Sequence, residues 1–397
     1  MTRRDRLGGE DRLVLALVVG GAEEEVKADL ARLLEGNLDW AVILERIDAH
    51  GLGPLACRSL GALGWAGVPL HARERLEAAS RVAALRNELL MEDLASVLRA
   101  FARAGIPAIP LKGPVLAESL YGDAGLRECS DLDLLVPREA VPRAWAALAA
   151  EKWTPAEAYL VESRDLDWLV ESNIEYAFAR SRGEFTSILE LHWDLAWRWR
   201  RGGLAAERFW ARARPAHVRD VPCLALDDAT QLLYLAIHAA RHRWQAAKWL
   251  VDIHELARRG SVNWDEVARI AAELRLLDVV RISLAACHAL FATPLPRALG
   301  PVALPPWLRL YPAEPAVTDM WSDALFPARL IAGPAARLRY LARVLLRPTL
   351  ADRLVLRLPD ALSVLYYPLR LLRLCGRWTW GRAGAGLRRL ATFAEER

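Results

Sequence analysis

Lysine and cysteine are scarce in this chain of 397 residues. Of the 53 basic residues, 49 are arginines and the four lysines are Lys27, Lys112, Lys152 and Lys248. The five cysteines are isolated, odd in number and without a CxxC pair, so neither a disulfide framework nor a zinc ribbon is indicated. This cysteine usage fits a reducing compartment, and we expect a cytoplasmic protein. Because arginine is abundant throughout a sequence rich in alanine and leucine, we do not take it as a signal for nucleic acid.

Long uncharged apolar runs are also missing. No window reaches the roughly 18 to 20 apolar residues that a membrane-spanning helix needs. The N-terminal stretch contains a short apolar run, but Asp5, Glu10 and Asp11 interrupt the segment and no clean cleavage site follows. We therefore expect neither a membrane span nor a signal peptide.

Positive charge is concentrated towards the C-terminus. The net charge is only +4, but residues 337–397 hold 13 arginines against four carboxylates, so the remainder of the chain is slightly acidic. A chain of this kind lacks the basic footprint of a protein whose main role is specific nucleic-acid binding. Arginine mixed with leucine, tyrosine and tryptophan in 337–397 leaves two interpretations open. The segment is either an amphipathic helical cap over the core or a peripheral contact with an anionic membrane surface.

Apolar periodicity predicts a division of the chain into four parts. Three-to-four spacing predicts amphipathic helices over 23–50 and 71–104, the second ending before Gly105. A further helical stretch begins at Asp227 or Asp228 as the N-cap and continues to about residue 292. The four parts are an N-terminal helical region (1–105), an α/β core (106–225), a helical domain packing on a cleft (226–292), and a Pro/Gly-rich crossing segment with a basic amphipathic tail (293–397).

Short apolar runs in the second part predict a mixed sheet of about four strands. The run 106–111 is followed by a lysine-glycine turn and by Pro114, which suits the first turn of a helix. Residues 131–136 alternate as a strand buried on one face does, and 174–181 and 185–193 read as two strands joined by a hairpin turn. The fold class is therefore α+β, with a small mixed β-sheet core flanked by N-terminal and C-terminal helical regions.

Three carboxylates fall on these predicted strands. Asp131 and Asp133 are two positions apart, so both side chains leave the strand on the same face. Paired carboxylates are costly unless a divalent cation, a cationic side chain or a shared proton relieves them. Glu190 would converge with them if its strand is the neighbour. Oxygen ligands of this kind suit Mg²⁺ or Mn²⁺, which would bridge to the phosphates of a nucleotide.

A cationic turn precedes the carboxylates. Lys112 and Gly113 end one strand and open a helix, where backbone N–H groups and the lysine can meet phosphate. Arg127 and Ser130 are within reach of the same place. His192 shares the strand face of Glu190, and it either contacts substrate or packs in the core.

The helical domain carries a stripe of polar and aromatic side chains. If the helix is continuous, helical spacing brings to one face His238, His242, Gln245, Trp249 and Asp252. Such a face suggests the wall of a cleft for nucleotide or acceptor. A minor alternative remains, in which His238, His242, Asp252 and His254 hold the metal of a phosphohydrolase, although the adjacent His-Asp pair of that class is absent.

Three stretches, taken together, resemble one known family. In order along residues 80 to 280 they are "LKGPVLAESLY...GLRECSDLDLLV", "LELHWDL" and "LLYLAIHAARHRW...LVDIHEL". They look like the bacterial uncharacterised nucleotidyltransferase family. The glycine turn, the Asp-x-Asp and the later carboxylate are similar to those of the wider DNA polymerase β-type nucleotidyltransferase superfamily, which implies a nucleotidyltransferase core in 106–225.

The resemblance also implies an activity. A nucleoside monophosphate would pass from an NTP, with ATP as the default, to an acceptor that is a small molecule, sugar, peptide or protein. Asp131, Asp133 and Glu190 would be the catalytic metal ligands, and Glu190 would also orient or deprotonate the acceptor. The expected nucleotide contacts are Lys112, Gly113, Arg127, Ser130, His192, His238, His242 and Asp252.

One residue departs from the superfamily pattern. Its members usually carry Gly-Ser at the phosphate turn, whereas Pro114 follows Gly113 and removes both a hydroxyl and an N–H donor. A second interpretation therefore stays open, in which the chain is a catalytically inactive nucleotidyltransferase fold that serves as a binding or scaffold protein.

Overall fold

The computed structural model describes residues 7–19, 24–156, 165–195, 204–312, 325–331 and 333–375. The chain divides into two compact units that are interleaved in sequence. The first comprises residues 1–157, 175–196 and 202–317, and the second comprises 158–174, 197–201 and 318–397. The four-part division inferred from the sequence stays a prediction. Among the described helices, none has the length and apolar character required to cross a membrane.

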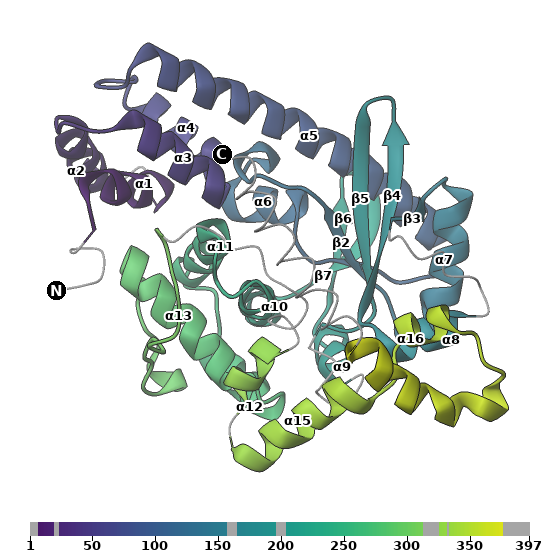
Figure 1. Ribbon diagram of the computed structural model, residues 1–397. Helices are drawn as coiled ribbons and strands as arrows, with labels where there is room; N and C mark the ends of the chain where they lie inside the picture. The colour runs from purple at the N-terminus through teal and green to yellow at the C-terminus, as the bar shows by residue number, and fades with distance from the viewer. Residues whose placement is uncertain are drawn as a thin grey trace, which may run out of the picture. The chain divides into compact units, whose positions relative to one another are not determined.

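Helices form the N-terminal part of the first unit (Figure 1). They are α1 (Gly9–Val19), α2 (Glu24–Leu34), α3 (Trp40–His50), α4 (Gly53–Ala62) and α5 (Leu70–Arg103). The prediction for 71–104 is confirmed by α5. This helix ends where Gly105 adopts a φ of 63° and the N–H of Ile106 donates to the carbonyl of Phe101. A left-handed glycine at this point closes the helix without the steric penalty that a side chain would bring.

The first unit contains a five-stranded mixed sheet in the order β1-β2-β5-β4-β3. Its strands are β1 (Ile109–Pro110), β2 (Leu132–Leu135), β3 (Thr154–Pro155), β4 (Glu175–Arg182) and β5 (Phe185–His192). Strands β2 and β5 are parallel, and the other neighbouring pairs are antiparallel. The α+β class with a small mixed sheet is thereby confirmed. The short strand β3 was not expected.

The β4–β5 hairpin sets the register of the sheet. Its turn is Gly183-Glu184, with Gly183 at a φ of 61°, so the hairpin expected between the two strands is confirmed. From this turn the antiparallel register runs back to Glu175 opposite His192. On its other edge β5 pairs with β2, seen beside it in Figure 1, so that Glu190 faces Asp133.

Short helices and a second hairpin complete the α/β part. They are α6 (Pro114–Tyr121), the 3-10 turns η2 (Ala124–Leu126) and η3 (Arg138–Ala140), α7 (Val141–Ala150), α9 (Leu204–Trp210), β6 (Arg214–Val218) and β7 (Val221–Ala225). Helix α7 packs against the sheet because Trp145 meets Tyr176 and Phe178 of β4, with ring centroids 5.1 and 4.7 Å apart. The β6–β7 hairpin lies where the sequence predicted no strand.

The helical stretch after Asp227 is interrupted. It consists of α10 (Asp228–Arg241), α11 (Ala247–Arg258), α12 (Trp264–Glu273), α13 (Leu277–Phe291) and the turn η5 (Arg297–Leu299). The N-cap prediction is confirmed, because the Asp227 carboxylate accepts the N–H of Thr230 at 2.9 Å. A continuous helix through the polar stripe is wrong. Arg243 and Trp244 adopt φ values of 58° and 55°, and the buried Trp244 indole donates to Ser283 at 2.7 Å, which turns the chain between α10 and α11.

The second unit holds α8 (Leu166–Ser172), η6 (Phe326–Leu330), α15 (Pro334–Leu346), α16 (Leu350–Val355) and η7 (Asp360–Leu365). Buried carboxylates organise it: Asp352 pairs with Arg370 at 3.0 Å and with Arg373 at 2.6 Å. Several arginines of the basic tail thus neutralise internal charge. The part of the tail after residue 375 lies outside the described residues.

Candidate functional site

Three side chains that can bind a metal converge where β2 and β5 run in parallel. One ligand atom from each of Asp133, Glu190 and His192 lies within 4.8 Å of the other two. Asp133 and His192 are buried, whereas 31% of the Glu190 side chain is exposed. The strand that carries Asp133 and the strand that carries Glu190 are therefore neighbours, as the predicted convergence of the carboxylates required.

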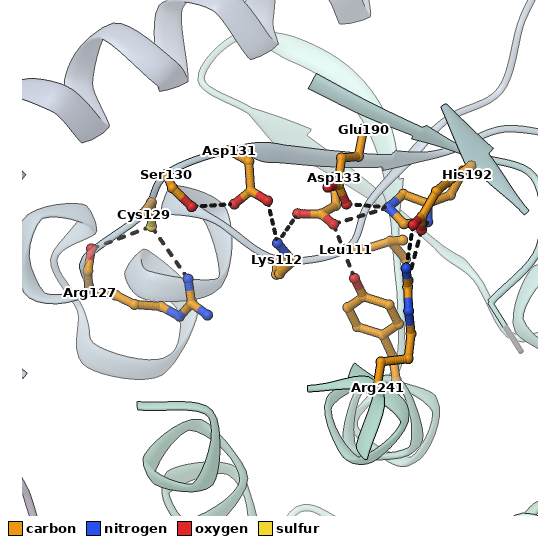
Figure 2. A network of polar contacts seen from close by, with 12 residues as sticks. Leu111, Lys112, Arg127, Cys129, Ser130, Asp131, Asp133, Glu190, His192 and Arg241 are labelled. Carbon is orange, nitrogen blue, oxygen red and sulfur yellow. Dashed lines mark hydrogen bonds and ion pairs between the residues drawn. The ribbon is translucent and has the colours of Figure 1, made fainter. Parts of the chain in front are cut away.

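Lys112 links the third predicted ligand to this group. Its Nζ atom lies 3.0 Å from Asp131 Oδ2 and 2.5 Å from Asp133 Oδ2 (Figure 2). Asp131 lies just before β2, and its other oxygen accepts the Ser130 hydroxyl at 3.1 Å. Burial alone would lower the pKa of Lys112, but the carboxylates, Asp133 foremost, outweigh it and raise that pKa. The lysine is thus a firm cation, and Asp131 reaches the cluster through it.

His192 holds the other side of the cluster. Its Nε2 atom lies 3.0 Å from Asp133 Oδ1 and 3.5 Å from Glu190 Oε2, and its Nδ1 atom lies 3.0 Å from Glu175 Oε2. Burial would lower the pKa of His192, but the surrounding carboxylates, with Glu175 contributing most, raise it well above its usual value. The ring is then an imidazolium, which donates hydrogen bonds and binds a metal only after it loses a proton.

Three residues that support the cluster of Asp133, Glu190 and His192 were not predicted from the sequence. Glu175 accepts Arg241 Nη1 at 2.8 Å, and the second nitrogen of the guanidinium contacts its other oxygen. The Tyr234 hydroxyl lies 3.5 Å from Asp133 Oδ1. The hairpin offered a signal for Glu175, since counting back from a two-residue turn places it opposite His192. Nothing in the sequence distinguishes Arg241 or Tyr234.

The turn before α6 is shaped by Gly113. Its φ of 83° and ψ of −150° belong to a region that only glycine adopts readily, and a Cβ atom there would lie 3.4 Å from the Asp131 carbonyl. Pro114 occupies the first turn of the helix, where an N–H has no partner inside the helix. The proline therefore costs the turn no internal hydrogen bond, although it still removes one donor.

Arg127 and Asp252, both predicted to contact the nucleotide, pair with each other. Arg127 Nε lies 2.9 Å from Asp252 Oδ2, and the two side chains are 5% and 1% exposed. The Tyr121 hydroxyl donates to the other oxygen of Asp252 at 2.8 Å. Burial would lower the pKa of Arg127, but the Asp252 charge raises it well above its usual value. The pair links the loop before the carboxylates to α11, and a role in nucleotide binding stays a prediction.

His238 and His242 form a ring cluster with Trp249. The centroids of His238 and His242 are 4.8 Å apart, and His242 stacks on Trp249 at 4.5 Å. Burial, helped by the charge of Lys112, lowers the pKa of His238 well below its usual value. Desolvation within the cluster and the charges of Arg241 and Lys112 lower the pKa of His242 to about 4, although His242 itself is exposed. The rings are therefore neutral near pH 7, and their contact with a nucleotide stays a prediction.

The phosphohydrolase ligands do not come together. His254 Nδ1 lies 2.8 Å from the Thr293 hydroxyl, and Asp252 is engaged by Arg127. Within the described parts of residues 7–375, the one group of three ligands that could share an ion is Asp133, Glu190 and His192.

The donor set suits a divalent cation. Asp133 Oδ2 is buried and meets Lys112 as an ion pair, yet it has no aligned hydrogen-bond donor among the residues that the structure describes. Carboxylate oxygens are the preferred ligands of Mg²⁺ and Mn²⁺, and an imidazole also suits transition metals. The cluster can thus hold a metal ion, whose identity the donors do not specify.

The geometry agrees with the comparison with known families. A family model described as "Uncharacterised nucleotidyltransferase" matches residues 36–292, well over half of the chain. No curated protein and no solved structure matches. The matched region includes the Lys112 turn, both carboxylate strands and helices α10 and α11. The chain belongs to the family of uncharacterised nucleotidyltransferases.

Proposed function

We propose that this protein transfers a nucleoside monophosphate from an NTP, with ATP as the first candidate, to an acceptor nucleophile. The observation that carries the proposal is that Asp133 and Glu190 lie opposite each other on adjacent parallel strands, while the Lys112 ammonium joins Asp131 to Asp133. Membership of a nucleotidyltransferase family supports the reaction class. The acceptor is a small molecule, a sugar, a peptide or a protein side chain.

Each residue of the site has a proposed role in the reaction. Asp131, Asp133 and Glu190 would hold Mg²⁺ or Mn²⁺, which would neutralise charge on the phosphates. Glu190 is the most exposed of the three, so it can reach an acceptor hydroxyl and take its proton. The acceptor oxygen then bonds to the α-phosphorus, the bond from that phosphorus to the bridging oxygen breaks, and pyrophosphate leaves. Lys112 and the Gly113 turn would face the phosphates.

Label transfer tests this proposal. Purified protein is incubated with each α-labelled NTP, Mg²⁺ or Mn²⁺ and candidate acceptors, and both transfer of the label to the acceptor and release of pyrophosphate are measured. We expect Asp133→Asn to lower the rate by at least about 100-fold, the scale of losing one group that stabilises transition-state charge. The matched control is Asp220→Asn, at an exposed turn between β6 and β7, which should retain the wild-type rate.

The inactive-scaffold interpretation makes the opposite prediction. If wild type and Asp133→Asn release equally little pyrophosphate with every nucleotide, and calorimetry detects no NTP binding, the transfer proposal fails and a scaffold is favoured. Pro114 does not decide the matter, because it stands at a helix position that tolerates proline.

We also propose that the second unit makes a peripheral contact with an anionic membrane. Of the sixteen exposed large apolar side chains found among the described residues, eleven lie between Leu338 and Leu372, within the arginine-rich segment. Exposed apolar groups suit a lipid surface, and the excess of arginine over carboxylates in residues 337–397 favours anionic lipid. In flotation assays the wild type should bind vesicles that contain anionic lipid and not neutral ones, and Leu371→Glu/Leu372→Glu should abolish the binding. Equal recovery of both proteins with anionic vesicles would contradict the contact.

A further inference from the structure

Lys112 lies on the carboxylates that are expected to bind the metal. Its ammonium lies 3.0 Å from Asp131 Oδ2 and 2.5 Å from Asp133 Oδ2, between the two side chains (Figure 2). Only 5% of the lysine side chain is exposed. The sequence led us to expect this lysine beside phosphate, whereas the structure places it on the carboxylates.

A divalent cation held by Asp131 and Asp133 would compete with Lys112 for these carboxylates, because their other oxygens already accept the Ser130 hydroxyl and contact His192. Mg²⁺ holds its oxygen ligands at about 2.0–2.1 Å and requires nearly ideal octahedral geometry. A metal that bridges these two carboxylates would therefore lie very close to the position of Lys112 Nζ. Two cations at such a distance repel strongly, the more so at a buried site where water screens little. The ammonium and the metal exclude each other from this position.

We propose that Lys112 is a built-in competitor of the metal ion, and that the triphosphate of an incoming nucleotide draws its ammonium off Asp131 and Asp133. The proposal rests on the proposed nucleotidyl transfer and adds the way in which the site fills. Lys112 directly precedes the Gly113 turn that is expected to face the phosphates, so a change of side-chain rotamer moves the ammonium from one anion to the other.

Metal and nucleotide binding are then coupled. The metal alone must displace Lys112 into a place without an anion, and the nucleotide alone meets an ammonium that is already paired with two carboxylates. When both ligands bind, each removes the obstacle to the other. The coupling is reciprocal, so the factor by which nucleotide tightens metal binding equals the factor by which metal tightens nucleotide binding.

Mn²⁺ binding to the full chain tests the competition without any need for turnover. Free Mn²⁺ is followed by electron paramagnetic resonance, with and without a non-hydrolysable ATP analogue. In the wild type the analogue should tighten Mn²⁺ binding at least tenfold. In Lys112→Met, Mn²⁺ alone should bind at least tenfold more tightly than in the wild type, and the analogue should add only a few-fold. The matched control is Lys152→Met, which removes an exposed lysine and should behave as the wild type.

A second variant and a second measurement keep the test decisive. Lys112→Arg retains a cation and should bind Mn²⁺ alone as weakly as the wild type. Lys112→Met leaves two carboxylates without their counter-ion, so Mn²⁺ should raise its melting temperature more than that of the wild type, even if the variant is less stable.

Two results would overturn the competition. One is wild-type binding of Mn²⁺ alone that is as tight as in Lys112→Met, and the other is identical behaviour of the Met and Arg variants. Failure of label transfer with the coupling intact would sink the proposed activity and leave the role of Lys112 standing. Label transfer without any coupling between metal and nucleotide would support the proposed activity and overturn the role of Lys112.

Discussion

The buried ion pair between Arg127 and Asp252 makes a strong prediction about stability. Asp252→Asn keeps the volume of the side chain and one oxygen for the Tyr121 hydroxyl, but it removes the negative charge. Arg127 would then be a buried guanidinium, 5% exposed, whose ion-pair partner Asp252 has become neutral. The guanidinium cannot release its proton near neutral pH, so the fold must bear the full electrostatic penalty.

The expected magnitude follows from the depth of the pair. Removing one partner of a buried, hydrogen-bonded ion pair typically costs about 3–5 kcal/mol, because the remaining charge is desolvated without compensation. We expect Asp252→Asn to fall in this range, a large share of the roughly 5–15 kcal/mol that stabilises a typical domain. Asp278→Asn is the matched control. Asp278 is 56% exposed and lies 3.5 Å from Arg281 on the same helix, so its loss should cost less than about 1 kcal/mol.

Amide hydrogen exchange of α11 and of the 122–131 loop measures this cost where it arises. The opening free energy of these segments should drop by the stated amount in Asp252→Asn and stay unchanged in Asp278→Asn. A drop of less than about 1 kcal/mol in Asp252→Asn would refute the reasoning, since it would mean that water or another group already solvates Arg127.

A double variant separates the lost charge from the lost contacts. In Arg127→Met/Asp252→Asn no buried charge is left unpaired, so the double variant should be more stable than Asp252→Asn alone. A double variant as unstable as the sum of the two single variants would show that the two side chains do not interact. Calorimetry of NTP binding on the same proteins tests the predicted role of both residues in nucleotide binding.

Two further predictions concern the turn and the buried histidines. Gly113→Ala should lower the free energy of unfolding in urea by about 1–3 kcal/mol, because alanine is strained at a φ of 83° and ψ of −150°. Gly122→Ala, with open space at its Cβ, should lower it less, and equal losses would contradict this account. Burial, with help from Arg258, lowers the pKa of His254 to about 4, below the roughly 6.5 of an unfolded chain, so the unfolded state binds more protons between these values. The free energy of unfolding should therefore fall by about 2 kcal/mol from this group as pH drops from 7 to 5, and His254→Gln, compared with the exposed His71→Gln, should flatten that slope.

Local patterns were enough to predict much of the fold. Helix α5 follows from apolar spacing that ends at a glycine, and the β4–β5 hairpin follows from alternation around a two-residue turn. The β6–β7 hairpin was not predicted, because each of its strands contains a proline, Pro215 or Pro222, which argues against a strand. The break after α10 escaped because Arg243 and Trp244 adopt left-handed φ values without a glycine to mark the turn.

The site was predictable wherever its chemistry depends on spacing along a strand. Asp131, Asp133 and Glu190 stand out as carboxylates on predicted strands, and the parallel pairing of β2 and β5 brings Glu190 to Asp133. Arg241 could not be found in this way, because one arginine among 49 carries no signal until α10 places it on Glu175. The contact of Lys112 with the carboxylates could not be predicted either. It depends on the direction that the Gly113 turn gives to the lysine side chain, and tertiary packing sets that direction.

The balance of charge in the site explains how such a cluster can fold at all. Four carboxylates meet there, and the described residues around them include three cationic side chains: Lys112, His192 and Arg241. Chains that rely on a metal to offset their ligands fold only when that metal binds. Here the side chains themselves offset most of the repulsion, so the sheet can assemble on its own. On the proposed competition, the cation that allows the carboxylates to fold would have to give way before a metal could use them.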